Sequence, residues 1–238
     1  MKRNDFNLNN LKARLGECAD KDKAEILQRF FKTGKGQYAE GDIFIGVTVP
    51  VMRKIAGEYL DLELDVVVTL LKSPIHEERL LSLLILVLKF QKADLINKEK
   101  IYLLYLKHTK HINNWDLVDL SAKHIVGSFL FDKGRKPLYI LAKSNNLWER
   151  RIAILSTHYF IERNDFTDTL KLSEILLADK HDLIHKAIGW MLREVGKRDL
   201  TVEDEFLAKY SRIMPRTMLR YAIERFPEEK RKQWLGGR

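Results

Sequence analysis

Apolar residues recur at the spacing of an α-helix along almost the whole chain. The first stretch places one apolar residue on the same side at each turn: Leu8, Leu11, Leu15 and Cys18. No stretch alternates apolar and polar residues as a half-buried strand does. Because a helix with one apolar stripe must bury it against another helix, this pattern predicts an all-α fold of roughly a dozen helices without a sheet.

Several of these helical stretches share a plan: a short polar or proline-containing start, a charged residue, then small or apolar residues. They begin near Pro74, Asn113, Asn145, His181 and Pro215, and Pro50 marks another helix start. The charged landmarks of four stretches lie about thirty to forty residues apart: Arg79, Asp119, Arg151 and Lys186. That period is typical of paired-helix repeats of the HEAT kind, which stack into a curved solenoid. With no linker in view, we expect one domain, residues 1–238, wound as a superhelix with a basic concave face.

We expect neither a membrane-spanning helix nor a signal peptide in this sequence. Its most apolar run, Leu80–Phe90, is flanked by charges and is shorter than a bilayer crossing requires, so we expect a buried helix. The first ten residues have no apolar signal region. The one cysteine, Cys18, excludes an internal disulfide and a cysteine-rich zinc site. These features fit a cytoplasmic protein.

Positive charge predominates. Lys and Arg number 42 against 33 Asp and Glu, for a net charge of +9, which favours a polyanionic partner such as nucleic acid. From Lys209 onward, nine basic residues face three acidic ones and supply +6 of this charge. Arg216 and Arg220 share a helical face there and are candidate phosphate contacts. The alternative is a solvated basic surface and helix end without a partner.

The stretch NNWDLVD, residues 113–119, places a tryptophan and two carboxylates together in this basic chain. On a helix, Trp115 and Asp119 project to the same side, whereas Asp116 points about a hundred degrees away. A carboxylate in the first turn is stabilised by the helix dipole, so Asp116 is assigned a structural role. Asp119 lies further along, where it could be a buried partner of an arginine or a functional acid.

Two later stretches repeat this association of tryptophan with charge. Trp148 shares a face with Arg151, while Arg150 is expected to face solvent. Trp190 lies near three basic residues at helical spacing: Lys186, Arg193 and Lys197. A tryptophan in a helical protein is usually part of the core. Three at equivalent repeat positions, each beside a charge, favour a surface that meets a ligand.

The sequence lacks the common motifs for nucleotide binding and for serine hydrolases. The chain has no P-loop, no GxGxxG and no GxSxG. Its seven histidines are scattered, and the close pair His108 and His111 has no Cys or Glu nearby to complete a metal set. We therefore expect neither a metal nor a cofactor.

Taken together, these features resemble the AlkD family of bacterial DNA alkylation repair glycosylases. The resemblance covers nearly the whole chain and rests on FIGVTVPVMRKIA (44–56), NNWDLVD (113–119), LWERRIAI (147–154) and HKAIGWMLREV (185–195). It implies HEAT-like repeats wrapped around duplex DNA. It also implies hydrolytic removal of purines alkylated on a ring nitrogen, such as 7-methylguanine and 3-methyladenine, as the first step of base excision repair. The family is thought to act through sugar and backbone contacts rather than by flipping the base into a pocket.

The resemblance also assigns residues. It places the catalytic aspartate on Asp119, the sugar-contacting tryptophans on Trp115 and Trp190, and the active-site arginine on Arg151. The family's loop toward the opposite strand is a polar, QTP-like sequence, but here it reads GVTVP, which leaves Thr48 as the contact. The remaining DNA contacts that we expect are Trp148, Lys186, Arg193, Lys197, Arg216 and Arg220.

Two other functions stay open. A non-catalytic relative could bind damaged, bent or branched DNA without releasing a base. A HEAT-repeat scaffold for an acidic protein would need no DNA. We expect a monomer that acts on double-stranded DNA containing alkylated purines.

Overall fold

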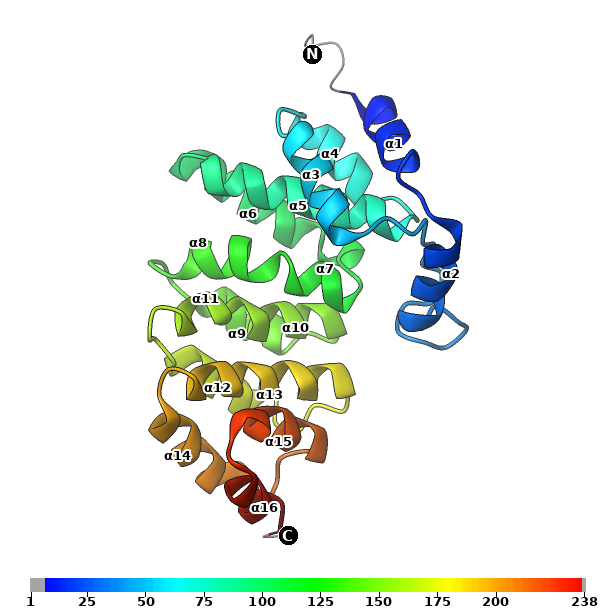
Figure 1. The fold of residues 1–238 in the computed structure, drawn as a ribbon. Coiled ribbons are helices and arrows are strands. Elements are labelled where there is room, and N and C mark those ends of the chain that lie inside the picture. Colours follow the sequence, from blue (N-terminus) through cyan, green and yellow to red (C-terminus); the bar gives the residue numbers. More distant parts are fainter. Residues whose placement is uncertain (1–6, 237–238) are drawn as a thin grey trace. The chain divides into compact units, whose positions relative to one another are not determined.

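The computed structural model describes residues 7–236, and in that range it contains helices and no β-strand (Figure 1). The all-α prediction is confirmed. Ile43 and Ile75 form an isolated parallel bridge. By its internal packing the chain divides after Ser121 into two compact units, which are described separately below. The single repeat domain expected from the sequence stays a prediction.

The first unit consists of α-helices and one 3₁₀ turn. They are α1 (Leu8–Gly16), α2 (Lys21–Phe30), α3 (Val49–Glu58), α4 (Leu64–Leu71), α5 (His76–Lys92), α6 (Leu95–Lys107), η2 (Thr109–His111) and α7 (Trp115–Asp119).

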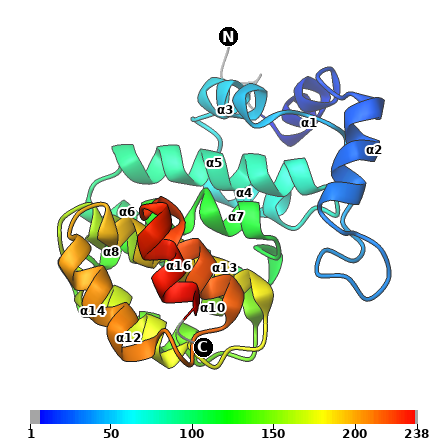
Figure 2. The ribbon, with the colours of Figure 1, turned by 60° about the horizontal axis from the view of Figure 1, so that its bottom comes forward.

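Helix α5 forms the centre of the first unit. The side chains of Leu81, Leu83 and Ile85 have no exposed surface. Helices α3, α4, α6 and α7 all pack against α5, and Figure 2 shows α3 on one side of it and α7 on the other. The expectation of a buried helix at Leu80–Phe90 is confirmed. Within residues 7–236, no helix combines the length and the apolar character that a membrane crossing needs.

The second unit continues with helices that pack in succession. They are η3 (Lys123–Gly127, a π-helical turn), α8 (Ser128–Leu130), α9 (Lys136–Ala142), α10 (Leu147–Ser156), α11 (His158–Ile161), α12 (Thr167–Ile175), α13 (Asp182–Gly196), α14 (Leu200–Tyr210), α15 (Arg216–Ala222), η4 (Ile223–Arg225) and α16 (Glu228–Gly236). Within this unit α10 packs on η3 and α13, and α13 packs on α15 (Figure 1). This layering agrees with a helical-repeat fold.

Prolines mark several helix starts, as the sequence predicts. Pro50 lies in the first turn of α3, Pro215 is the N-cap of α15, and Pro74 stands two residues before α5. Pro137 lies in the first turn of α9. Proline suits these positions because its missing N–H would have no partner within the helix.

A glycine explains how closely two helices of the second unit approach. A Cβ atom at Gly189 in α13 would lie 2.4 Å from the carbonyl oxygen of Met218 in α15. No real Cβ tolerates that distance to a backbone atom, so a larger residue would force the two helices apart.

Glu203 in α14 gives the second unit a pH-dependent stability. Its side chain is 1% exposed, and Oε1 has no hydrogen-bond partner. Burial and the neighbouring Asp204 raise the pKa of Glu203 to about 8. Because the folded chain holds this proton more tightly than the unfolded chain does, the carboxyl favours folding at low pH. That contribution is lost as the pH rises from about 4.5 to about 8.

We therefore expect Glu203→Gln to flatten the pH dependence of the free energy of unfolding between pH 4.5 and 8. The amide keeps the shape and cannot ionise, so the variant should exceed the wild type in stability at pH 8, by up to about 5 kcal/mol. Urea unfolding across this range measures the difference. Parallel curves for the two proteins would show that Glu203 does not titrate there.

Candidate active site

Helix α7 begins at a buried asparagine. The Asn114 side chain is fully buried, and its Oδ1 accepts a hydrogen bond of 2.8 Å from the Trp115 backbone N–H. Its Nδ2 donates to Asp42 Oδ2 at 3.3 Å. This short helix is thus held at its N-cap residue by a contact with a residue 72 positions away in the chain, which fixes the direction of the side chains that follow.

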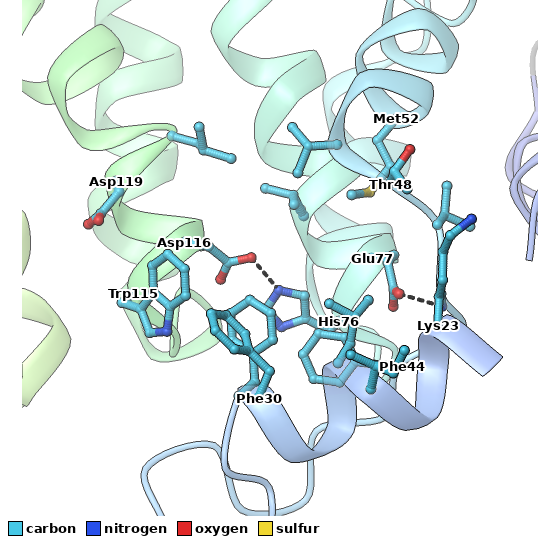
Figure 3. A pocket seen from close by; sticks show the side chains of 18 residues that line it. Lys23, Phe30, Phe44, Thr48, Met52, His76, Glu77, Trp115, Asp116 and Asp119 are labelled. Atoms are coloured by element: carbon cyan, nitrogen blue, oxygen red, sulfur yellow. Dashed lines mark hydrogen bonds and ion pairs between the residues drawn. The ribbon is translucent and has the colours of Figure 1, made fainter. Parts of the chain in front are cut away.

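Asp116 lies in the first turn of α7, as expected, and points toward His76 of α5 (Figure 3). Its Oδ2 lies 2.8 Å from His76 Nε2, and its Oδ1 accepts a hydrogen bond from the Leu117 N–H. The structural role assigned to Asp116 therefore includes a buried ion pair in addition to its place at the helix start.

His76 lies between two carboxylates. Its other ring nitrogen, Nδ1, is 3.1 Å from Asp42 Oδ2, and Asp42 Oδ1 pairs with Arg79 Nη2 at 2.7 Å. Burial by itself lowers the pKa of His76, but the charges and hydrogen bonds of Asp116 and Asp42 outweigh it and raise that pKa above its ordinary value. Burial raises the pKa of Asp42, but His76 and Arg79 outweigh it and hold that pKa below its usual range. The sequence reasoning missed this buried network.

Trp115 packs into a group of aromatic rings from the segment before α3. Its ring stacks on Phe31, with centroids 5.0 Å apart and an interplanar angle of 18°. The Phe30 ring meets the Trp115 ring edge-on, with centroids 6.0 Å apart. The Trp115 Nε1–H donates a hydrogen bond of 3.2 Å to the Tyr38 hydroxyl. Phe44 also stacks with Phe31, with ring centroids 4.9 Å apart. The sequence reasoning missed this group of rings as well.

Asp119 projects to the side of α7 that faces away from His76 (Figure 3). Its side chain is half-buried, one helical turn after Trp115. Both residues line the same cavity, as their spacing predicts. The structure thus separates the two carboxylates of NNWDLVD, with Asp116 joined to the buried network and Asp119 at the cavity.

This cavity has a volume of about 460 Å³ and lies within the first unit. Helices α2, α3, α5 and α7 and the segment that leads into α3 all contribute to its wall (Figure 3). Most of the lining is aromatic or aliphatic. The charged residues in the lining are Lys23, His76, Glu77, Asp116 and Asp119.

The segment that leads into α3 is fixed by a glycine and a buried glutamate. Gly46 has φ +85°, and a Cβ atom there would lie 2.0 Å from the Asp20 carbonyl oxygen, so only glycine fits. The backbone N–H groups of Ile45 and Gly46 donate to Glu77 at 3.1 and 2.8 Å. Thr48 follows as the exposed N-cap of α3, without a side-chain capping bond, and lines the cavity. Its contact with DNA stays a prediction.

Helix α10 differs from the expected arrangement. Arg151 is 5% exposed, and its Nη1 donates to the Leu183 carbonyl oxygen. Trp148 is 7% exposed, which leaves little of its ring for a DNA contact. The expectation that Arg150 faces solvent is wrong, because Asp179 covers it with an ion pair of 2.6 Å. Phosphate binding by Arg151 stays a prediction.

Helix α13 pairs each of its predicted DNA-contacting cations with a carboxylate. Lys186 pairs with Asp182, Arg193 with Glu224, and Lys197 with Glu194. Such pairs can open when a phosphate competes, because these side chains are only partly buried.

Trp190 is half-buried on α13. Its Nε1 donates to Glu194 Oε1 at 3.0 Å, and its ring meets His158 edge-on. A carboxylate therefore lies beside this tryptophan too. Arg216 and Arg220 are exposed on α15, as a phosphate contact requires. Trp115, Asp119 and Thr48 meet at one cavity of the first unit, whereas the other assigned residues belong to the second.

Candidate metal ligands among the described side chains are those of His, Cys, Asp and Glu. Among residues 7–236, no three His, Cys, Asp or Glu side chains gather into a group that could hold a metal ion. The rings of His108 and His111 lie 6.4 Å apart, but no third ligand from the described part of the chain joins them in such a group.

Comparison with known proteins identifies the family. No curated protein matches the chain. Its fold is similar to that of a predicted DNA alkylation repair enzyme from Enterococcus faecalis, with a TM-score of 0.68 and 17% identity over 88% of this chain and 97% of that one. It is also similar to AlkD2 from Streptococcus mutans, with a TM-score of 0.54 and 17% identity over 87% and 99% of the two chains. A model of the DNA alkylation repair enzyme family matches residues 11–226, so the chain belongs to that family.

Proposed function

We propose that the chain is a monofunctional DNA glycosylase that hydrolyses the N-glycosidic bond of cationic alkylpurines in duplex DNA. The observation that carries the proposal is the position of Asp119. In a member of a DNA alkylation repair family, a half-buried carboxylate lies one turn from Trp115 at the edge of an apolar cavity. On this proposal 7-methylguanine and 3-methyladenine are the substrates.

The chemistry explains why a carboxylate suits the reaction. A purine alkylated on a ring nitrogen carries positive charge and leaves readily, so the leaving group needs little help from an acid. The sugar becomes oxocarbenium-like as the bond breaks, as in glycoside hydrolysis. A carboxylate stabilises that developing charge and can orient the attacking water. Asp119 is proposed in this role, without a metal or cofactor.

The aromatic and basic residues are proposed to support the sugar and the backbone. An indole attracts a nearby cation by roughly 0.5 to 2 kcal/mol, a role proposed for Trp115 and, from the second unit, for Trp190. Arg151 is proposed to bind a phosphate, because a guanidinium matches the geometry of phosphate oxygens. Thr48 is proposed to contact the opposite strand.

One observation favours the alternative of a protein that binds damaged DNA without cleaving it. The Trp115 ring already stacks on Phe31 and donates to Tyr38, so part of it is engaged within the protein. Release of 7-methylguanine from methylated duplex DNA separates the two functions. A glycosylase releases the base faster than spontaneous depurination, and a binding protein does not.

Phosphate contacts on α15 should appear in the salt dependence of DNA affinity. Each lost phosphate contact lowers the slope of log affinity against log salt by about 0.9. We therefore expect the double variant Arg216→Ala/Arg220→Ala to bind duplex DNA more weakly. Its affinity should also depend less steeply on salt, with the magnitude of the slope reduced by about 1.8. Fluorescence anisotropy at several salt concentrations measures it.

A matched control is Lys100→Ala/Lys107→Ala on α6, which removes two exposed cations to which no DNA contact is assigned. Equal slopes for the α15 variant and the wild type would contradict the assignment of Arg216 and Arg220. A chain that does not bind duplex DNA at moderate salt would instead fit a scaffold for an acidic protein.

A further inference from the structure

We propose that Glu194 is a positioning residue for Trp190. Its carboxylate holds the indole in one orientation and strengthens the attraction of the ring face for positive charge. The inference rests on the proposed function, in which Trp190 attracts the oxocarbenium-like sugar, and names a further residue of that same site. It requires no base to leave the stack, because the indole acts on the sugar.

The backbone beneath Trp190 is fixed by the packing of two helices. A Cβ atom at the preceding residue, Gly189, would lie 2.4 Å from the Met218 carbonyl oxygen, so α13 and α15 are in close contact there. The freedom that remains lies in the side chain, because an indole can occupy several rotamers on a fixed helix. The contacts of the side chain therefore decide where the ring face of Trp190 points.

Two contacts restrain the Trp190 indole. Its Nε1–H donates a hydrogen bond of 3.0 Å to Glu194 Oε1, and the two side chains lie on one side of α13 because they are four residues apart. The ring of His158 in α11 meets the indole at an angle of 66°, with centroids 5.7 Å apart. The Trp190 side chain is half-buried, so part of its ring remains accessible to a ligand.

Glu194 is ionised in this arrangement. Its Oε1 also accepts a bond of 2.6 Å from Lys197 Nζ. Burial by itself raises the pKa of Glu194, but the bonds from Lys197 and Trp190 outweigh it and lower that pKa. A hydrogen bond to an ionised acceptor is roughly twice as strong as a neutral one, which makes it an effective restraint. It also polarises its donor, so the π face of the indole becomes more negative.

His158 is uncharged at neutral pH. Burial and the charge of Lys123 lower the pKa of His158. The other charged groups around it are Glu162, Glu194 and Lys197, and Lys123 pairs with Glu162 at 2.5 Å. A neutral imidazole places no positive charge beside a ring that is proposed to attract a cation. The surroundings of the indole therefore suit a site for positive charge.

The hydrogen bond between Trp190 and Glu194 can be measured without DNA. In nitrogen–proton NMR spectra of the labelled chain, the Trp190 indole resonance is identified by its loss in Trp190→Phe. A bond to a carboxylate shifts this proton downfield, so Glu194→Gln should move the resonance upfield. The matched control Glu205→Gln makes the same change at an exposed carboxylate of α14 and should leave the resonance in place. An unchanged resonance in Glu194→Gln would overturn the inference.

A double-mutant cycle shows whether Glu194 acts through Trp190. Glu194→Ala should slow release of 7-methylguanine from duplex DNA by about threefold to thirtyfold, the loss of one cation–π contact. In a Trp190→Phe background, which has no indole N–H to hold, the same change should have little further effect. Rates are compared at a temperature where circular dichroism shows each variant folded, and Glu205→Ala should keep the wild-type rate. Equal slowing in both backgrounds, or a wild-type rate in Glu194→Ala, would contradict the positioning role.

A binding experiment separates failure of this inference from failure of the proposed function. The probes are duplexes that carry a pyrrolidine abasic analogue, which is positively charged, or the neutral tetrahydrofuran analogue. The wild type should bind the pyrrolidine duplex more tightly, and Glu194→Ala should lose most of that preference. No preference in the wild type, or the same preference in Glu194→Ala, would refute the role of Glu194 and leave the glycosylase proposal intact. No release of base by the wild type would refute the glycosylase, and the preference for the pyrrolidine duplex would still decide the inference.

Discussion

Asp119→Asn is expected to release 7-methylguanine from methylated duplex DNA at least about a hundredfold more slowly than the wild type, the usual effect of removing one electrostatic stabiliser from a reaction centre. The amide has nearly the same shape as the carboxylate and lacks its charge. The change therefore acts on the developing positive charge of the sugar rather than on packing. Single-turnover rates with excess protein measure the chemical step.

Asp61→Asn is the matched control, since this exposed aspartate lies in the same unit and has no assigned role. Its rate should equal that of the wild type. Binding of Asp119→Asn to DNA with a tetrahydrofuran abasic site shows whether the variant still recognises its target. Wild-type rates in Asp119→Asn would remove the carboxylate from the mechanism.

The second large effect is expected at Asp42. Asp42→Ala should lower the free energy of unfolding of the first unit by about 3 to 5 kcal/mol, the usual cost of breaking a buried ion pair from one side. The change leaves Arg79, 4% exposed, and His76, 1% exposed, without their shared carboxylate. It also removes the acceptor of Asn114, which starts α7. Urea unfolding followed by far-ultraviolet circular dichroism measures the loss.

Glu99→Ala on α6 truncates an exposed carboxylate in the same unit and should change stability by no more than about 0.5 kcal/mol. An equally small loss in Asp42→Ala would contradict the buried network. The network also predicts a secondary result: release of 7-methylguanine should fall in Asp42→Ala at a temperature where the variant is still folded, because α7 carries Trp115 and Asp119.

Helical spacing was sufficient to separate the two carboxylates of NNWDLVD. Trp115 and Asp119 are four residues apart and line one cavity, and Asp116 takes the first turn of the helix. Local geometry decides such relations, so a sequence can predict them. The partners of Asp116 could not be predicted in this way. His76 lies 40 residues from Asp116, and Asp42 lies 34 residues from His76, so only the folded chain brings the three together.

The same limit explains two features of α10 that the spacing did not predict, the ion pair of Arg150 and the burial of Trp148. Spacing correctly placed Arg150 away from Arg151, but it could not show that Asp179 approaches that side of the helix. Trp148 appeared to belong to a ligand-facing surface because a charge stands beside it at helical spacing. Its burial to 7% exposure depends on neighbouring helices, and a helix covered on several sides has no single buried face to predict.

The cavity could not be predicted from the sequence for a related reason. Phe30 is the last residue of α2 and Phe31 is its C-cap, whereas Phe44 follows a long connecting segment. Gly46 then allows the chain to pass within contact of Asp20. A chain that turns back on itself here joins rings whose separation in the sequence follows no helical period. Positive φ at glycine marks such a turn only after the structure is known.

The most direct test of the central claim is single-turnover release of 7-methylguanine from methylated duplex DNA by the wild-type chain, followed by chromatography of the freed base. If the chain is an alkylpurine DNA glycosylase, the base should appear well above the rate of spontaneous depurination in a matched sample without protein, and chelators should leave that rate unchanged. Release no faster than in the protein-free sample, under conditions where the chain binds the same DNA, would contradict the claim and establish a protein that binds DNA without cleaving the glycosidic bond.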